Sequence, residues 1–220
     1  MKYQIDYENH VIDVEVTYKK IKAIYMKVED GMIKVSAPIG TSWTYIEKVI
    51  DKHRSRLFKE VLSYQEYYDY RDNGYVLIFN QLYTIKLMHT QKRHCAIHHD
   101  CLYVYHKDIQ KTVEMFLKDL LYDYIQKRID DYLLGDFYIP MPYIEIKKYK
   151  RRWGCCYVKE EKVSFNFSLV HLDKELIDYV IVHELTHFLV HDHSQMFYSE
   201  VQKRLKDYKV RQKRLKEVHV

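Results

Sequence analysis

Residues 183–193 read HELTHFLVHDH, with four histidines and one glutamate in eleven residues. On an α-helix His183 and His187 lie four positions apart, so their rings project from one face, one turn above each other. Two imidazoles at that spacing can bind one zinc ion through nitrogens at about 2.0–2.1 Å. Glu184 is offset by one residue and can reach a metal-bound water without being a ligand. The stretch therefore predicts a metal site on a helix.

The residues before this stretch are typical of an amphipathic helix over about 174–191. Asp173 can cap its first turn, and Glu175 favours the positive end of the helix dipole. One apolar face follows the helical period and consists of Ile177, Ile181, Leu185 and Phe188. The histidines lie on a neighbouring face, so the helix can pack into a core and still present them to a metal ion.

A catalytic zinc takes a third protein ligand and keeps one position open. His191 lies eight residues after His183, about 12 Å along an unbroken helix, which is too far for one ion. His193 lies beyond the expected end of the helix, where a chain reversal can bring it back, and we predict it as the third ligand. Glu200 is a rival, and it requires the following helix to pack back across the first.

The composition fits one globular domain, or one domain with a smaller appendage. Hydrophobic residues make up 47% of the 220 residues, enough to bury a sizeable core. The formal net charge of +5 favours anionic substrates but falls short of the imbalance expected of a dedicated nucleic-acid binder. The four cysteines form no C-x-x-C pair, and neither a signal peptide nor a membrane span is recognisable, so we expect a cytoplasmic protein without membrane contact.

The rest of the chain predicts an α+β fold, with a β-rich N-terminal portion (1–106) that includes a helix and a mainly helical C-terminal portion (107–220). The two portions could also form one integrated domain. The strongest helical period in the chain covers residues 108–134. The predicted strands lie within 3–37 and at 75–79, 82–88, 102–105, 144–146 and 163–167. The other predicted helices cover 42–70, 174–191 and 195–216.

Two basic stretches suggest contacts with anions. Residues 147–152 read KKYKRR, and this run is expected either to protect an exposed strand edge or to form an anion-binding rim near the metal. Residues 203–216 contain eight lysines or arginines on an expected amphipathic helix. This tail could contact nucleic acid, although a solvated helix face is the favoured interpretation.

Five short motifs in the last third of the chain form a pattern. They are RRWGCC at 151–156, FNF at 165–167, IDYV at 177–180, HELTH at 183–187 and HS at 193–194. The pattern resembles the YgjP-like metal-dependent hydrolases, which are related to the SprT-like zincins. The order of the upstream elements is also similar, so the resemblance extends over nearly the whole chain. Cys155 in place of serine and Tyr198 in place of tryptophan depart from the family pattern, and neither removes an expected ligand.

The resemblance implies a zincin-like helical core that carries the H-E-x-x-H motif. It implies His183, His187 and His193 as the metal ligands, which agrees with the choice of His193 over His191. It also implies Glu184 as the catalytic base. The expected cofactor is a divalent metal ion, with zinc favoured by the ligand set.

The expected reaction is hydrolysis of a peptide-like bond by a metal-bound water that Glu184 activates. Arg152 and Tyr179 are predicted near the site, where they could stabilise a developing oxyanion. An alternative is a metal-dependent nucleoside triphosphate pyrophosphatase that uses the basic run 147–152. A second alternative is a nucleic-acid-associated module without hydrolysis. The expected partner is therefore a peptide or nucleotide substrate, with nucleic acid less favoured.

Overall fold

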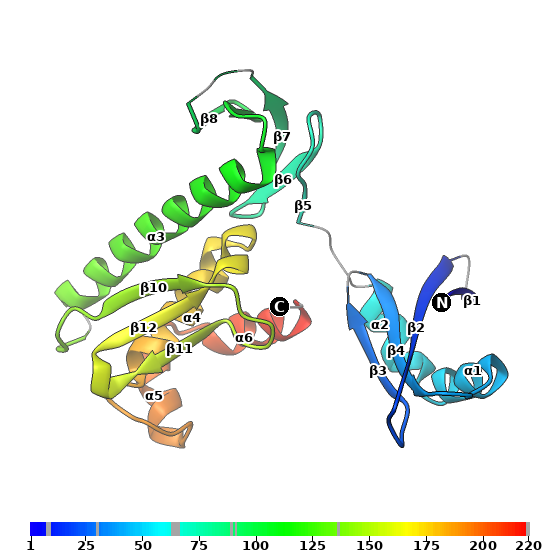
Figure 1. Ribbon diagram of the computed structural model, residues 1–220. Helices are drawn as coiled ribbons and strands as arrows, with labels where there is room; N and C mark the ends of the chain where they lie inside the picture. The colour runs from blue at the N-terminus through cyan, green and yellow to red at the C-terminus, as the bar shows by residue number, and fades with distance from the viewer. Residues whose placement is uncertain are drawn as a thin grey trace. The chain divides into compact units, whose positions relative to one another are not determined.

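The protein consists of two compact units, Met1–Glu66 and Tyr67–Val220 (Figure 1). The structure is a computed structural model that describes residues 1–7, 10–29, 31–62, 67–88, 90, 92–135 and 137–218. Each unit has a hydrophobic core of its own. The boundary lies earlier than the expected division between 106 and 107, because Val76, Ile85 and Leu102 are buried in the same core as the C-terminal helices.

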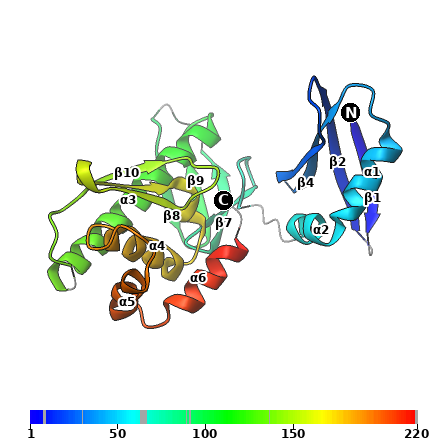
Figure 2. The same ribbon diagram turned by 90° about the horizontal axis from the view of Figure 1, so that it is seen from below.

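The N-terminal unit is a four-stranded sheet with two helices on one face (Figure 2). Its elements are β1 (Lys2–Tyr7), β2 (His10–Lys19), β3 (Tyr25–Glu29), β4 (Met32–Pro38), α1 (Trp43–Lys52) and α2 (Arg54–Leu62). The strand order is β1-β2-β4-β3, with β2 and β4 parallel and the other neighbours antiparallel. Alternate residues of β4, Ile33, Val35 and Ala37, are buried, as expected of a strand with one covered face.

The prediction of a single helix over residues 42–70 is wrong, because the structure has two shorter helices there. The chain leaves helical geometry at His53, with φ −113° and ψ 13°, and two helices result. Both contribute buried residues to the core on the sheet, among them Ile50 of α1 and Leu57 of α2. Tertiary packing thus overrides a continuous helical period here. Residues 63–66 of the predicted helix lie outside the described part of the chain.

The C-terminal unit combines two sheets with helices. Its strands are β5 (Tyr68–Asp69), β6 (Tyr75–Ile78), β7 (Gln81–Leu87), β8 (Cys95–His98), β9 (Cys101–Val104), β10 (Tyr143–Lys147), β11 (Gly154–Tyr157) and β12 (Lys162–Asn166). Its helices are α3 (Ile109–Gly135), α4 (Lys174–Thr186), α5 (Gln195–Arg204) and α6 (Tyr208–Glu217), with 3₁₀ turns η1 (Val158–Glu160) and η2 (Phe167–His171). The sheet orders are β5-β6-β7-β9-β8 and β10-β12-β11. Two sheets with segregated helices confirm the predicted α+β class.

Helix α3 confirms the helix predicted over 108–134. A fully buried residue recurs every four positions along it, namely Val113, Leu117, Leu121, Ile125 and Ile129. One apolar stripe therefore faces the core along most of the helix. The helix contacts β10, η2 and α4. No helix in the described ranges is long and apolar enough to cross a membrane.

An ion pair fixes α4 against α3. The guanidinium of Arg128 on α3 donates to both carboxylate oxygens of Asp178 on α4, at 2.9 and 3.0 Å. The hydroxyl of Tyr124 donates to the same carboxylate at 2.8 Å. Helix α4 also contacts β11, α5 and α6. The helix that carries the H-E-x-x-H motif is thus held on several sides.

Three strands and two helix ends were not predicted, and one of these strands, β5, lies within the helix predicted over 42–70. Strand β11 has the sequence GCCY, without the β-branched residues that indicate a strand, and it forms through antiparallel pairing with β12. Strand β8 contains only one β-branched residue, Ile97. Helix α4 ends at Thr186, earlier than predicted. The helix predicted over 195–216 is divided at Leu205, which leaves helical geometry at φ −131° and is buried.

Candidate metal centre

Helix α4 places two histidines at its C-terminal end. Asp173 precedes the first turn, and of the apolar face identified in the sequence Ile177, Ile181 and Leu185 are buried. Phe188, the fourth member, lies beyond the end of the helix and is half-buried. His183 lies in the last turn, and His187 is the C-cap residue directly after Thr186. Their ring centroids lie 5.1 Å apart, and the rings are nearly perpendicular at 85°. The four-residue spacing therefore puts both imidazoles on one side of the helix end.

The chain reverses after α4 and brings His193 to these two residues. The carbonyl of Thr186 accepts hydrogen bonds from the N–H groups of Leu189 and Val190, both at 2.9 Å, which closes the turn. The Nε2 of His193 then lies 3.0 Å from the Nε2 of His183. His183, His187 and His193, called the histidine cluster below, each offer a nitrogen within 4.8 Å of the others.

The two rival ligands make other contacts. The Nδ1 of His191 lies 3.0 Å from the carbonyl oxygen of His187. Glu200 pairs with Arg204 at 2.8 Å and also with Lys203. Within the described ranges, the histidine cluster is the only group of three or more His, Cys, Asp or Glu side chains close enough to hold a metal ion.

Phe197 on α5 contacts all three rings of the histidine cluster. Its ring centroid lies 4.9, 4.7 and 4.9 Å from those of His183, His187 and His193, and its side chain is fully buried. A phenyl ring offers no strong hydrogen-bonding group, so it orients the imidazoles and leaves their nitrogens free. Sequence reasoning gave Phe197 no role, although its position four residues after His193 was an available signal.

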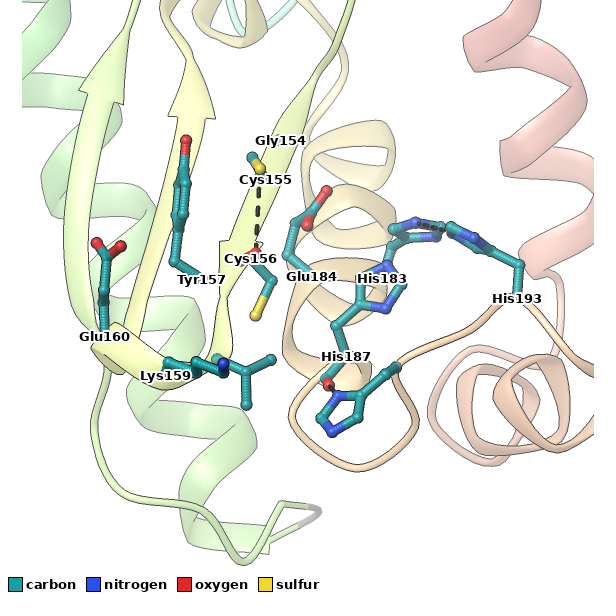
Figure 3. A pocket seen from close by; sticks show the side chains of 12 residues that line it. Gly154, Cys155, Cys156, Tyr157, Lys159, Glu160, His183, Glu184, His187 and His193 are labelled. Atoms are coloured by element: carbon teal, nitrogen blue, oxygen red, sulfur yellow. Dashed lines mark hydrogen bonds between the residues drawn. The ribbon is translucent and has the colours of Figure 1, made fainter.

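The carboxylate of Glu184 lies between the histidine cluster and β11 (Figure 3). The side chain is only 6% exposed, and the N–H of Cys156 donates a hydrogen bond to it. A Cβ at position 154 would lie 2.6 Å from its Oε1, so Gly154 leaves the space that the carboxylate occupies. Burial raises the pKa of Glu184 to about 8, while the Cys156 hydrogen bond and the charge of Arg152 oppose that rise.

Neither Gly154 nor Cys156 was singled out as a site residue from the sequence. Both lie in the RRWGCC motif, which was the available signal. Their role depends on β11 lying alongside α4, and these two elements are in contact. A strand that approaches the second residue of an H-E-x-x-H motif through a glycine leaves room for a buried carboxylate.

Two imidazoles of the cluster are held in the neutral form. Burial, together with the nearby His187 and His193, lowers the pKa of His183 to about 3. Burial and His193 also lower the pKa of His187. The Nδ1 of His183 is buried without a hydrogen-bond partner, so the polar contacts of this ring lie on its Nε2 side. Neutral imidazole nitrogens are the form that binds metals, so the site fits a cation that prefers nitrogen ligands, unlike Mg²⁺ or Ca²⁺.

Two pockets adjoin the cluster and share Gly154, His183 and Glu184. The larger, about 700 Å³, is lined by β11, η1 and histidines 183, 187, 191 and 193 (Figure 3). The smaller, about 380 Å³, lies between residues 151–154, helix α4 and the end of α6. We call the smaller one the α6-side pocket. The buried carboxylate of Glu184 is thus reached from two sides.

Arg152 and Tyr179 both line the α6-side pocket. Tyr179 is buried, which raises its pKa to about 12, although a hydrogen bond with Gln212 opposes the rise. Its hydroxyl is therefore protonated at neutral pH. The guanidinium of Arg152 lies 5.6 Å from the ring centre of Tyr149. The structure thus brings both residues to a pocket that also contains Glu184.

The basic run 147–152 does not form one patch. Lys147 pairs with Glu145 at 2.9 Å, and Lys148 pairs with Glu114 at 2.7 Å. Of the run, only the two arginines, 151 and 152, line the α6-side pocket. The expected anion-binding rim is therefore narrower than the sequence suggested.

Comparison with known proteins assigns the chain to a family. The model of the family described as YgjP-like, metallopeptidase domain, matches residues 22–218, and no curated protein matches the chain. Two solved structures are similar to part of it. The metallopeptidase zymogen abylysin of Pyrococcus abyssi is 20% identical, with 41% of this chain and 90% of that chain covered and a TM-score of 0.39. The zymogen jannalysin of Methanocaldococcus jannaschii is 24% identical, with 39% and 90% covered and a TM-score of 0.35. Because the family model covers far more than half of it, the chain belongs to the YgjP-like metallopeptidase-domain family and is a metal-dependent hydrolase.

Proposed function

We propose that this protein is a zinc-dependent peptidase in which the histidine cluster binds the metal and Glu184 is the general base. The observation that carries the proposal is the convergence of three histidine nitrogens within 4.8 Å beside one buried carboxylate. Three neutral imidazoles are a common ligand set for catalytic zinc, which keeps a further position open for water or substrate. The family match supports the hydrolase class on independent grounds.

Different residues of the site would bind the metal, transfer the proton and stabilise the negative charge. When bound by the histidine cluster, zinc supplies Lewis-acid polarisation and lowers the pKa of a water molecule. Glu184 takes a proton from the attacking water and returns it to the leaving amine. With a pKa of about 8 in the metal-free site, this carboxyl group needs a further positive charge to act as a base at neutral pH, and a zinc ion bound by the histidine cluster would supply that charge. Arg152 and the protonated hydroxyl of Tyr179 are the candidates to stabilise negative charge on the substrate oxygen.

The edge position of β11 supports a peptide as substrate. In its sheet β11 pairs with β12 alone, and it lines the larger pocket beside the histidine cluster. An extended peptide can add to such an edge through main-chain hydrogen bonds. This would place one peptide bond of the substrate next to Glu184.

The two alternatives receive less support. A nucleoside triphosphate pyrophosphatase would use the run 147–152, but Lys147 and Lys148 are paired with carboxylates and only two arginines of the run reach a pocket. A nucleic-acid module would use the tail, but Arg211 pairs with Asp207, and Arg214 pairs with carboxylates at the start of α4. Nucleoside triphosphates belong in the functional test as a competing substrate class.

The test is hydrolysis by zinc-loaded protein and three variants. We expect cleavage of unstructured peptides and no release of pyrophosphate from nucleoside triphosphates. Glu184→Gln should retain zinc and lose roughly 10²–10⁴-fold in cleavage rate, the usual contribution of a general base. His187→Ala should lose both zinc and activity, whereas the matched control His191→Ala should keep its zinc. Pyrophosphate release that disappears in Glu184→Gln would replace the peptidase by the pyrophosphatase.

A further inference from the structure

We propose that the α6-side pocket is a subsite for a carboxylate of the peptide substrate, located close to the scissile bond. The inference rests on the proposed peptidase function and names its substrate class. The carboxylate could belong to an aspartate or glutamate side chain or to the C-terminus of the peptide, and the experiment below separates these sources.

The α6-side pocket lies next to the larger pocket, at the proposed general base. It shares Gly154, His183 and Glu184 with the larger pocket, so the two pockets adjoin each other on either side of the buried carboxylate. A substrate that lies across Glu184 from the larger pocket must enter the α6-side pocket. At about 380 Å³ this pocket can accept one or two residues.

The α6-side pocket carries positive charge on its exposed side. Arg151, Arg152 and Lys216 line it, all three are exposed, and in the part of the chain that the structure describes none of them forms an ion pair. By contrast, Arg211 and Arg214, on the same helix as Lys216, are paired. Three cations around one pocket, of which Arg152 also acts on the Glu184 carboxylate, favour an anionic group.

The rest of the lining of the α6-side pocket is mainly apolar. Among the residues that the structure describes, Glu184 is the one acidic residue that lines the α6-side pocket, whereas the larger pocket also has Lys159 and Glu160. Apolar side chains from three elements complete the lining, namely Trp153, Val180, Leu215 and Val218. An apolar lining below a cationic rim matches a side chain with a methylene stem and a terminal carboxylate, such as glutamate. A phosphate group would use the rim and leave the apolar surface without a partner.

The experiment measures kcat/KM on capped peptides with one variable residue. Glutamate, glutamine or lysine is placed in turn at two positions on each side of the cleaved bond, and a second set compares free and amidated C-termini. One exposed ion pair changes a rate by up to about five-fold. Because three cations line the pocket, we expect roughly ten-fold preference for glutamate over glutamine at one position, or for the free over the amidated C-terminus.

Variants then test whether the cations of the α6-side pocket cause the preference for a carboxylate. Arg151→Gln combined with Lys216→Gln should abolish the preference for the carboxylate, because kcat/KM for the glutamate peptide falls to that for the glutamine peptide. Lys159→Gln, which removes an exposed cation from the larger pocket, is the matched control and should retain the preference. No preference in the wild-type protein, or a preference that persists in the double variant, would overturn the subsite.

Binding to zinc-loaded Glu184→Gln separates this proposal from the peptidase proposal. Anisotropy of labelled glutamate and glutamine peptides should show the same preference without turnover, and it should weaken with salt. Preference in binding without any cleavage by the wild-type protein would keep the subsite and remove the peptidase. Cleavage without a preference for glutamate in either measurement would keep the peptidase and remove the subsite.

Discussion

At the scale of single residues, the position of the Glu184 carboxylate depends on a glycine in another element. Gly154 on β11 has no side chain where a Cβ would lie 2.6 Å from Oε1 and 2.7 Å from Cγ of Glu184. The N–H of Cys156, two residues along the same strand, donates to the carboxylate. One strand thus makes room for the proposed base and orients it.

We therefore expect Gly154→Ala to reduce peptide cleavage by about 10²-fold, the usual cost of a misplacement near 1 Å. Zinc content should not change, because the histidine cluster is not touched. Gly135→Ala is the control, since a Cβ there meets nothing within 4 Å. Equal activity of the two variants in a kcat/KM assay would show that the contact between position 154 and Glu184 is unimportant.

His171 carries a second prediction at this scale, on stability. Its side chain is 2% exposed, its Nδ1 lies 2.7 Å from the carbonyl oxygen of Leu77, and its ring stacks on Tyr67 at 5.2 Å. Burial lowers its pKa from 6.5 to about 4, and the hydrogen bond to Leu77 opposes the shift. Between these two values the unfolded chain binds a proton that the folded chain does not. The free energy of unfolding should therefore fall by about 3 kcal/mol as the pH drops from 6.5 through 4.

Urea unfolding of metal-free protein at pH 7.5, 5.5 and 4 measures this effect. His171→Phe keeps the stacking on Tyr67 and cannot titrate, so its stability should depend less on pH than that of the wild type. Because the other titrating groups are the same, the difference between the two proteins isolates position 171. Parallel pH dependences would contradict the prediction.

At the scale of elements, α5 completes the site that α4 begins. The turn after α4 returns His193 to the cluster, and Phe197 on the first turn of α5 contacts all three rings. The helix is in turn packed against α4. The geometry of the histidine cluster therefore depends on the contact between two helices as well as on the spacing of the H-E-x-x-H motif.

We expect Phe197→Ala to lower the free energy of unfolding by about 3–5 kcal/mol, as for other buried phenylalanines, and also to weaken zinc binding. Phe137→Ala is the matched control, because Phe137 is equally buried but is not among the rings that contact the cluster. Competition with a chelator measures zinc affinity under conditions where both variants are folded. Equal zinc affinities would show that the rings need no support from Phe197.

At the scale of the whole molecule, the two units have separate cores, and the histidine cluster lies entirely in the second. A ligand that binds only the folded form of a unit stabilises that unit by about 2.7 kcal/mol at 100 times its dissociation constant. We expect zinc to raise the melting temperature of Tyr67–Val220 by roughly 5–10 °C and to leave that of Met1–Glu66 unchanged.

The two tryptophans make this prediction measurable, because Trp43 lies in the first unit and Trp153 in the second. Trp153→Phe leaves fluorescence that reports on the first unit, and Trp43→Phe leaves fluorescence that reports on the second. Thermal unfolding of each variant is followed with zinc and with EDTA. A zinc-dependent shift of the Trp43 signal as large as that of the Trp153 signal would contradict independent units.

Much of the fold was readable from local pattern. The four-residue spacing of apolar side chains predicted α3, and the same reasoning on α4 predicted which face is buried and which presents His183 and His187. The features within helices succeed because helical periodicity depends on residues within one or two turns. His193 was preferred to His191 on the assumption of an unbroken helix, but α4 ends at Thr186 and a turn brings His193 next to His183, so its role as a ligand stays a prediction.

Other features were decided by tertiary structure alone. The strand β11, the glycine that accommodates Glu184, the contact of Phe197 with three rings and the α6-side pocket all join segments distant in the chain. The breaks at His53 and Leu205 and the boundary after Glu66 likewise carry no local signal in the sequence. The sequence by itself determined the candidate ligand types and the helix that carries two of them, since both follow from short-range spacing. Tertiary packing decided which elements surround the histidines and Glu184, because that depends on which apolar surfaces are buried together.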